Sequence, residues 1–436
     1  MKWLLPFVGM AAFSAAYGAN VPSQITFHKD VEAILENHCQ ECHRPGEIAP
    51  FSLLTYEQTR PWAKAIRADV LGKKMPPWFA DPHYGHFSND RSLSKEEVAT
   101  ITAWVDSGAK EGDVKDSPKS KEFYDGWNIP APDLVISMKE PFNLPATGEV
   151  QYQYIVMPTQ FTEDHWIQAV EARPSNREVV HHIVVFIRPK ESKWLRAAQP
   201  GIPYTPPGGG KDFTNTSGGG SDILMIYTPG MVPEIWRPGL GKLIRAGSDL
   251  VFQVHYTTSG KATSDLSKIG LVFAREKPTE RAQTFAASSL TFKIPPQDPN
   301  FEVDAKQVFP NGAQILSLFP HMHLRGKAFE YDLTYPDGRT ETLLKVPKYD
   351  FFWQLNYKLD KPLNVPAGAT IACKAWYDNS PNNAHNPDPA AEVRFGEQSR
   401  EEMMFGFFDI VMPADMTLRE FLTPKKDKDK DKATGE

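Results

Sequence analysis

The sequence contains Cys39-Gln40-Glu41-Cys42-His43, a C-x-x-C-H motif that uses two of the three cysteines in the chain. This pattern attaches c-type haem covalently, through thioethers to both cysteines and an axial bond to the histidine imidazole. A redox dithiol is the other chemistry that a C-x-x-C spacing supports. We therefore expect one covalent haem c at Cys39, Cys42 and His43, in a chain that carries electrons.

The first 18 residues are typical of a secretory signal peptide. They contain one lysine, an apolar run from Trp3 to Phe13, and small residues at Ala16 and Gly18 that favour cleavage after Gly18. No later apolar run has transmembrane length, so we expect no membrane span in the mature chain. Covalent haem attachment suits the same periplasmic or secreted location, and a retained N-terminal anchor is the alternative.

The composition limits the class of protein. Cys373 is the third cysteine, so no intramolecular disulfide remains once the other two bind haem. The 436 residues allow about three domains, and the 38 prolines and 11% aromatic residues favour loop-rich β structure. The formal net charge of −6 gives no indication of nucleic-acid binding.

The segment from Thr26 to Gly108 has helical periodicity. Apolar residues predict helices around Val31–Leu35, over Glu57–Leu71 and over Ser94–Gly108, the last with the capping-box signature Ser94-Lys95-Glu96-Glu97. With the C-x-x-C-H motif between them, these helices resemble a small class I cytochrome c. The resemblance implies an all-α haem domain at residues 22–113.

The resemblance also implies a second axial haem ligand from a methionine in a late loop. Met75, followed by Pro76 and Pro77, is the only methionine between Cys42 and Gly108. We therefore predict Met75 as the ligand, with His83 and His86 as its rivals and simple burial as the alternative. Ligation by methionine and histidine raises the haem potential relative to two histidines.

Beyond a polar linker at residues 114–128, the periodicity changes from helix to strand. The chain then predicts two all-β, jelly-roll-like sandwiches at residues 129–293 and 294–422, a Gly/Ser-rich loop at 206–222, and a disordered charged tail at 423–436. The expected fold class is thus a small all-α domain followed by two all-β domains. Strands are expected at residues 150–156, 167–171, 179–186, 249–257, 269–273, 315–319, 329–334, 352–359 and 402–412.

Several of the twelve histidines fall in patterns that suit a metal. His321 and His323 lie two residues apart, so on a strand they project from one face. His181 and His182 are adjacent and could bind one ion only at a bulge or strand end. His255 alone is compatible with a hydrogen-bonded core residue. Imidazole and thioether ligands favour copper over magnesium or calcium, whereas zinc remains compatible with these residue types.

The string Leu250-Val251-Phe252-Gln253-Val254-His255-Tyr256, with the histidine pair upstream and the H-x-H downstream, resembles the copper type II, ascorbate-dependent monooxygenases. These include the peptidylglycine α-hydroxylating and dopamine β-hydroxylating enzymes. The resemblance implies two coppers in two β-sandwich domains. It matches His181, His182 and His255 to an electron-transfer copper, and it matches His321, His323 and Met403 to an oxygen-activating copper. Met404 and Met412 are the rivals of Met403.

The resemblance implies that a C–H bond of a small-molecule substrate is hydroxylated with O2. We expect the electrons to come from a one-electron donor, either ascorbate or a periplasmic redox protein. Because the haem motif and the copper motifs lie on one chain, we expect the fused haem to deliver them. The positions that match the peptide-carboxylate site are Phe319, Phe405 and Phe407, so we expect an apolar or aromatic substrate. Packing of these phenylalanines in the core is the alternative.

Two other functions are compatible with these motifs. The first is a haem and copper protein that transfers electrons or carries copper without oxygenase activity. The second keeps the haem and treats the β region as a structural or carbohydrate-binding module. A methionine-containing site with an open position favours the oxygenase, whereas a closed site favours transfer.

Overall fold

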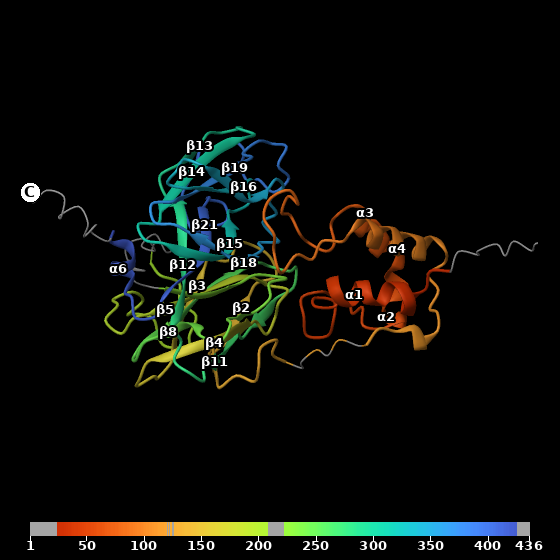
Figure 1. Cartoon of the computed structure of the whole chain (residues 1–436), viewed down its shortest axis with the longest axis horizontal. Helices are drawn as coiled ribbons and strands as arrows, with labels where there is room; N and C mark the ends of the chain where they lie inside the picture. Colours follow the sequence, from red (N-terminus) through yellow and green to blue (C-terminus); the bar gives the residue numbers. More distant parts are fainter. Residues whose placement is uncertain (1–23, 120, 122, 124–125, 208–221, 425–436) are drawn as a thin grey trace, which may run out of the picture.

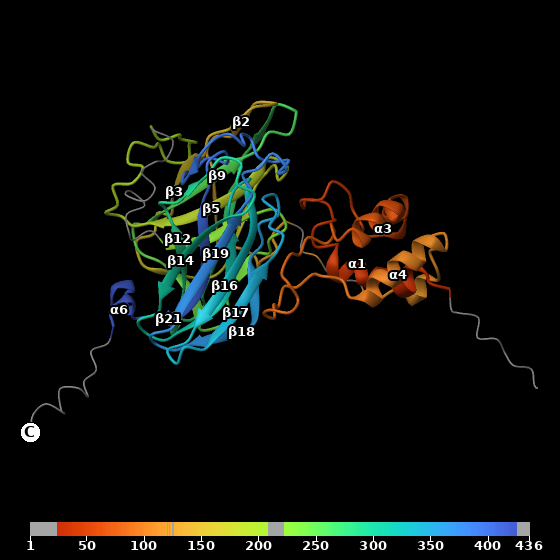
Figure 2. The ribbon, with the colours of Figure 1, turned by 90° about the horizontal axis from the view of Figure 1, so that it is seen from above.

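The computed structural model describes residues 24–119, 121, 123, 126–207 and 222–424. The predicted signal peptide, most of the predicted 206–222 loop and nearly all of the charged tail lie outside these residues. Figure 1 shows a helical segment beside a larger body of β-strands, and Figure 2 shows the same separation from above. Within the described part of the chain, no helix combines the length and the apolar character needed to cross a membrane.

The helical segment consists of short elements. They are the π-helix η1 (Phe27–Val31), α1 (Glu32–His38), α2 (Tyr56–Thr59), the 3-10 helix η2 (Arg60–Trp62), α3 (Ala63–Leu71), α4 (Lys95–Asp106) and the 3-10 helix η3 (Val114–Asp116). The helix predicted over residues 57–71 is divided, because Pro61 falls at the start of η2 and cannot donate an amide hydrogen bond. The predicted capping box of α4 is confirmed between Ser94 and Glu97.

The β region is organised around one nine-stranded sheet. Its order is β1-β11-β4-β8-β12-β21-β15-β18, and β7 pairs with β4. These strands are β1 (Leu134–Ser137), β4 (His165–Arg173), β7 (Glu234–Ile235), β8 (Leu240–Ile244), β11 (Lys268–Phe273), β12 (Glu280–Ser289), β15 (Ala313–His321), β18 (Tyr357–Val365) and β21 (Met404–Pro413).

Two four-stranded sheets accompany the nine-stranded sheet, with orders β3-β9-β5-β6 and β14-β19-β16-β17. The first contains β3 (Gln153–Pro158), β5 (Val180–Arg188), β6 (Asp222–Tyr227) and β9 (Asp249–Tyr256). The second contains β14 (Phe301–Val308), β16 (Gly326–Thr334), β17 (Thr340–Val346) and β19 (Thr370–Tyr377). Two short pairs, β2 (Phe142–Leu144) with β10 (Thr263–Asp265) and β13 (Lys293–Ile294) with β20 (Val393–Arg394), and the C-terminal α6 (Leu418–Leu422) complete the described elements.

The predicted fold class was wrong. The described chain is mostly β with a few short helices, and no all-α cytochrome domain is evident among the described residues. The β strands also do not divide into two separate sandwiches at residue 293. β12, from the first predicted sandwich, pairs along its whole length with β21 from the second. The long antiparallel pairing therefore joins both halves in one sheet.

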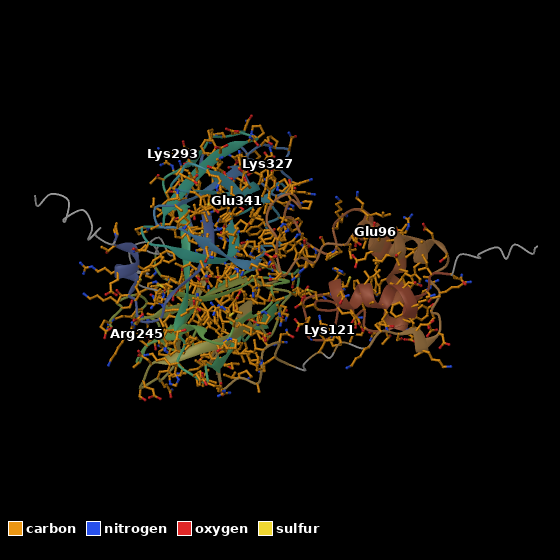
Figure 3. All side chains as sticks on the ribbon, in the orientation of Figure 1. Glu96, Lys121, Arg245, Lys293, Lys327 and Glu341 are labelled. Atoms are coloured by element: carbon orange, nitrogen blue, oxygen red, sulfur yellow. The ribbon has the colours of Figure 1, made fainter. Side chains whose placement is uncertain are left out.

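Each four-stranded sheet covers its own hydrophobic core. One core includes Ile155, Val170, Ile183 and Phe252, and the other includes Ile315, Phe329, Ile371 and Phe408. Charged side chains, such as Glu96, Arg245, Lys293, Lys327 and Glu341, lie exposed on the outside (Figure 3). Stability of the β region therefore rests on burial of apolar surface between sheets.

A strap at residues 78–91 fixes the helical segment to the β region. Phe87 forms an isolated β-bridge with Leu359, and the backbone N–H of Ser88 donates to the Lys358 carbonyl at 2.8 Å. The Trp78 and Tyr357 rings make an edge contact with centroids 4.9 Å apart. The strap therefore packs against β18, at the edge of the nine-stranded sheet.

Candidate metal centre

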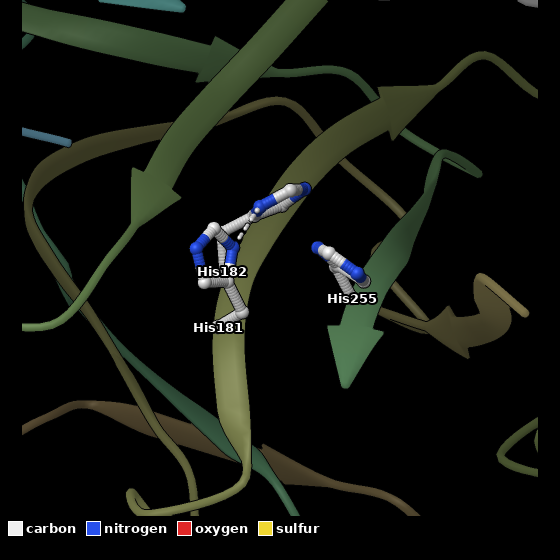
Figure 4. Close-up of side chains that lie close together, drawn as sticks. All are labelled: His181, His182 and His255. Carbon is white, nitrogen blue, oxygen red and sulfur yellow. Dashed lines mark hydrogen bonds between the residues drawn. The ribbon is translucent and has the colours of Figure 1, made fainter. Parts of the chain in front are cut away.

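His181, His182 and His255 come together on two neighbouring strands, β5 and β9 (Figure 4). β5 pairs with β9 antiparallel, and its register shifts between Val180 and His182, where His182 is opposite His255. This irregularity brings both adjacent histidines to one site, as the sequence required for them to share an ion. One ligand atom from each of the three residues lies within 4.8 Å of the others.

Hydrogen bonds define which nitrogens of this triad are available. His181 Nε2 lies 2.9 Å from the Phe351 carbonyl oxygen, which can only accept, so Nε2 carries the proton. His181 Nδ1 then carries no proton, and it is hydrogen-bonded to His182 Nδ1 at 3.1 Å. His255 Nε2 contacts Ser399 Oγ at 3.0 Å, and its buried Nδ1 has no hydrogen-bond partner among the described residues. An orphaned buried nitrogen is costly unless a ligand satisfies it, so the triad fits a metal.

His321 and His323 lie at the end of β15 and in the turn after it. His321 Nδ1 donates to Gln354 Oε1 at 2.6 Å, and His323 Nδ1 lies 3.2 Å from the Glu401 carbonyl oxygen. Their Nε2 atoms are therefore the available donors. His323 Nε2 is buried without a hydrogen-bond partner in the described structure. Glu402 accepts from the backbone N–H of His323 at 2.8 Å and holds this turn.

All five imidazoles favour the neutral, metal-binding form. Burial lowers the pKa of His181 and of His321 to about 4. Burial and neighbouring histidines lower the pKa of His182, His255 and His323 well below the usual value. Neutral imidazole is the ligand form, so these rings are ready to bind metal at neutral pH without losing a proton.

The two groups of histidines form one cluster. The His182 and His321 ring centroids are 5.7 Å apart, close to the 5.3 Å between His321 and His323. The Phe351 ring stacks on His181 at 4.2 Å and lies 6.3 Å from His323. The sequence placed these groups in separate domains, and nothing in it indicated how close they are, because the contacts join residues far apart along the chain.

The methionine segment meets the same cluster. Met403 precedes β21 and lines a cavity together with His182 and His321. Met404 is fully buried in the hydrophobic core of the second sheet, and Met412 lies near the far end of β21, opposite Arg281. The geometry therefore favours Met403 over both rivals as a ligand, and its coordination stays a prediction.

The predicted pocket residues Phe319, Phe405 and Phe407 line this cavity as well. Phe405 and Phe407 stack with centroids 5.2 Å apart, and Phe319 lies opposite Phe407 on β15. The sequence did not identify Phe351, Gln354 and Ser399, which orient the histidines. Residues 352–359 were predicted as a strand, yet β18 begins only at Tyr357, and the preceding loop supplies Phe351 and Gln354.

The C-x-x-C-H motif lies directly after α1. The backbone N–H groups of Cys42 and His43 both donate to the Cys39 carbonyl, at 3.1 and 2.9 Å, so the motif forms a tight turn. His43 Nδ1 lies 3.3 Å from the Phe51 carbonyl oxygen, which leaves Nε2 as the available donor. Burial raises the pKa of the Cys39 thiol to about 12 and raises the pKa of Cys42. Two thiols and one oriented imidazole fit covalent haem.

The second predicted haem ligand remains a prediction. Met75 is half-buried just after α3, and its backbone N–H donates to the Asp69 carbonyl at 3.4 Å. Its rivals lie in the strap. His83 is exposed and pairs with Asp81 at 2.6 Å, and the His86 carbonyl accepts from the Asp360 N–H at 3.0 Å.

The motif and the residues just after it also contact the β region. Glu47 lies 3.2 Å from Arg177, four residues before His181, and 3.6 Å from Arg173. Arg91, at the end of the strap, donates to the Gly230 carbonyl at 2.9 Å and lies 4.0 Å from Glu41 within the motif. The C-x-x-C-H motif and the residues that follow it are therefore tied to the β region through Arg91 and Glu47.

Comparisons with known proteins do not assign the chain to a family. No family model matches it, and no curated protein does. Solved structures with some likeness include PNGF-II, at 10% identity and a TM-score of 0.25, covering 64% of this chain and 65% of PNGF-II. The infectious bursal disease virus VP2 subviral particle has 9% identity and a TM-score of 0.19, covering 66% and 75%. The STIV MCP has 9% identity and a TM-score of 0.21, covering 58% and 97%.

Proposed function

We propose that this chain is an exported, haem- and copper-containing monooxygenase. It hydroxylates a C–H bond of a small, apolar or aromatic substrate, and a covalent haem delivers the electrons. The observation that supports this most is the cluster of five buried histidines with Met403 beside an apolar cavity. A protein that only carries copper or transfers electrons is expected to hold its metal in a site with no open coordination position. This cluster instead opens on a cavity lined by aromatic rings.

The donor set favours copper. His181, His182 and His255 would hold one ion, and His321, His323 and Met403 would hold a second. Imidazole with thioether suits copper better than magnesium or calcium. When bound, copper supplies one-electron chemistry with O2. The overall reaction takes R–H, O2, two electrons and two protons to R–OH and water.

The surrounding residues position these ligands. The Phe351 carbonyl and the Gln354 side chain accept from the ring N–H groups of His181 and His321, which fixes the tautomer and the direction of each ring. Phe319, Phe405 and Phe407 supply an apolar wall that excludes water and binds the substrate by contact area. Cys39, Cys42 and His43 would hold the haem, for which ascorbate or a periplasmic redox protein would be the electron donor.

The first experiment measures iron and copper per chain after maturation with haem-attachment machinery. We expect about one iron and two coppers, with a loss of copper in His323→Ala because this substitution removes a ligand. His385→Ala, at an exposed histidine, is the matched control. An iron-containing chain without stoichiometric copper in copper-replete medium would contradict the proposal.

A further inference from the structure

The loop at residues 351–356, called the orienting loop below, joins the two groups of histidines by hydrogen bonds. The Phe351 carbonyl accepts from His181 Nε2 at 2.9 Å, and it also accepts from Gln354 Nε2 at 3.2 Å. The second contact fixes the amide orientation, because a carbonyl can only accept, so Oε1 of Gln354 faces His321 Nδ1 at 2.6 Å. A displacement of the orienting loop would therefore change the direction of both rings at once.

Side chains from elsewhere in the chain bind the backbone of the orienting loop, which precedes β18 and lies outside the strands. Thr228 Oγ1 donates to the Gln354 carbonyl at 2.5 Å. Asn89 Nδ2 donates to the Asn356 carbonyl at 2.7 Å, and Asn89 Oδ1 accepts from the Lys358 N–H at 3.0 Å. Asn89 therefore uses both ends of its amide, as a neighbouring strand would use its backbone, to fix the point where the orienting loop enters β18.

Asn89 belongs to the strap, and its neighbours in the strap bind the same strand. The Ser88 N–H donates to the Lys358 carbonyl at 2.8 Å. The Asp360 N–H donates to the His86 carbonyl at 3.0 Å. β18 is the last strand in the order of the nine-stranded sheet, so the strap covers its edge. The strap itself is therefore held by several backbone hydrogen bonds, and it can fix the position of the orienting loop.

Arg91 makes a second link, which runs from the orienting loop to the C-x-x-C-H motif. Its guanidinium donates to the Gly230 carbonyl at 2.9 Å. Gly230 has a φ of +78°, and a Cβ at this residue would lie 3.0 Å from the Trp353 ring, so this ring of the orienting loop packs closely on the glycine backbone. On the other side, the Arg91 carbonyl lies 3.2 Å from His38 Nδ1, in the residue just before the motif, and the guanidinium lies 4.0 Å from Glu41 within it.

We propose that the strap positions the metal centre, with Asn89 and Arg91 as its positioning residues. Docking of the helical segment on the β region holds the orienting loop in place, and the orienting loop holds the rings of His181 and His321. This inference rests on the proposed function for the identity of the metal, and it adds a dependence of the histidine cluster on the segment that carries the C-x-x-C-H motif. Copper affinity at both groups of histidines should therefore change when the strap is altered.

The first test uses the full, metal-free chain with ¹⁵N-labelled histidine and determines the ring tautomers by NMR. In the native chain, His181 should carry its proton on Nε2 and His321 on Nδ1. Asn89→Ala breaks two hydrogen bonds, so both rings should become mixtures of tautomers, and the amides of residues 353–358 should exchange about tenfold faster. Asn364→Ala is the matched control, because it removes an exposed side-chain hydrogen bond with Gln314 further along the same strand, and it should change neither measurement.

Arg91→Ala provides a second variant that leaves the Asn89 amide in place, and it should change the tautomers of both rings in the same direction. Competition with a copper chelator should then show both variants binding copper roughly threefold to tenfold more weakly at both groups of histidines, a smaller loss than for a residue that contacts a ligand directly.

Native tautomers in both variants, together with faster exchange in the helical segment, would mean that the strap only holds this segment, and this result would overturn the inference. Equal changes in Asn364→Ala would overturn it as well. A native chain that binds no copper would contradict the proposed function, whereas the tautomers of the metal-free chain would still decide the inference.

Discussion

The C-x-x-C-H motif and the histidine cluster differ in how the chain builds them. The motif is a single turn of five consecutive residues after α1, held by local backbone hydrogen bonds. The cluster takes its members from β5, β9, the end of β15 with the turn after it, and the residue before β21, so that residues as far apart in the sequence as His182 and Met403 meet at one site. A local motif therefore reveals its chemistry in the sequence, whereas the cluster reveals its ligand types but not its geometry.

The largest expected effect is a complete loss of haem that leaves the copper content of the histidine cluster unchanged. Replacing Cys39 and Cys42 together by serine removes both thioether bonds, so covalent haem should be lost entirely. Copper content should stay unchanged, because the histidines lie on other elements. Haem staining of the denatured chain, with metal analysis of the folded one, measures both. Cys373→Ala, at a cysteine buried in the core, should keep its haem; equal haem loss in this control would contradict the assignment.

The second prediction tests whether the cluster acts as one unit. The His182 ring lies 5.1 Å from His255 and 5.7 Å from His321, between the two groups of ligands. His182→Ala should therefore weaken the binding of both coppers, by about tenfold or more. Competition with a copper chelator measures each affinity, with exposed His385→Ala as control. If only one copper were weakened, the two groups would be independent sites.

Sequence reasoning predicted which histidines could bind a metal, but it did not predict how they come together. Strand alternation predicted His321 and His323 on one face of a strand, whereas β15 ends at His321 and His323 lies in the turn after it. The irregularity that His181 and His182 require is present in β5. The sequence could not predict that β12 and β21 pair, because long-range register depends on packing between distant strands. This pairing makes the nine-stranded sheet continuous across both halves of the β region.

The loop before β18 was missed for a different reason. Apolar residues over 352–359 have strand composition, yet Phe351 and Gln354 use their polar groups to orient histidines instead of pairing in a sheet. In the helical segment, Pro61 divides a helix that apolar spacing had favoured. In both places the structure follows a specific residue or hydrogen bond and not the average composition of the segment.

The third prediction concerns a pH response in the β region. Burial raises the pKa of Glu397 to about 8 from its ordinary value of 4.5. The folded state then binds more protons than the unfolded state between these values, so stability should fall as pH rises from 4.5 to 8. This loss amounts to about 4 kcal/mol of unfolding free energy between pH 5 and pH 9, and Glu397→Gln should abolish it. Chemical denaturation across this range measures it, and exposed Glu276→Gln should show the native pH dependence.

The smallest predicted effect concerns the contact between the two regions. The Glu47 carboxylate is largely buried and lies within 3.6 Å of Arg44, Arg173 and Arg177. Glu47→Gln removes the negative charge that lies beside these three guanidinium groups. We therefore expect the contact between the helical segment and the β region to be less stable by about 2 kcal/mol. Faster hydrogen exchange at residues 39–53, with unchanged exchange in β15 and β21, would measure this. Glu392→Gln breaks an exposed pair with Arg394 and should have little effect. Unchanged exchange in Glu47→Gln would mean that the strap alone holds the haem motif against the β region.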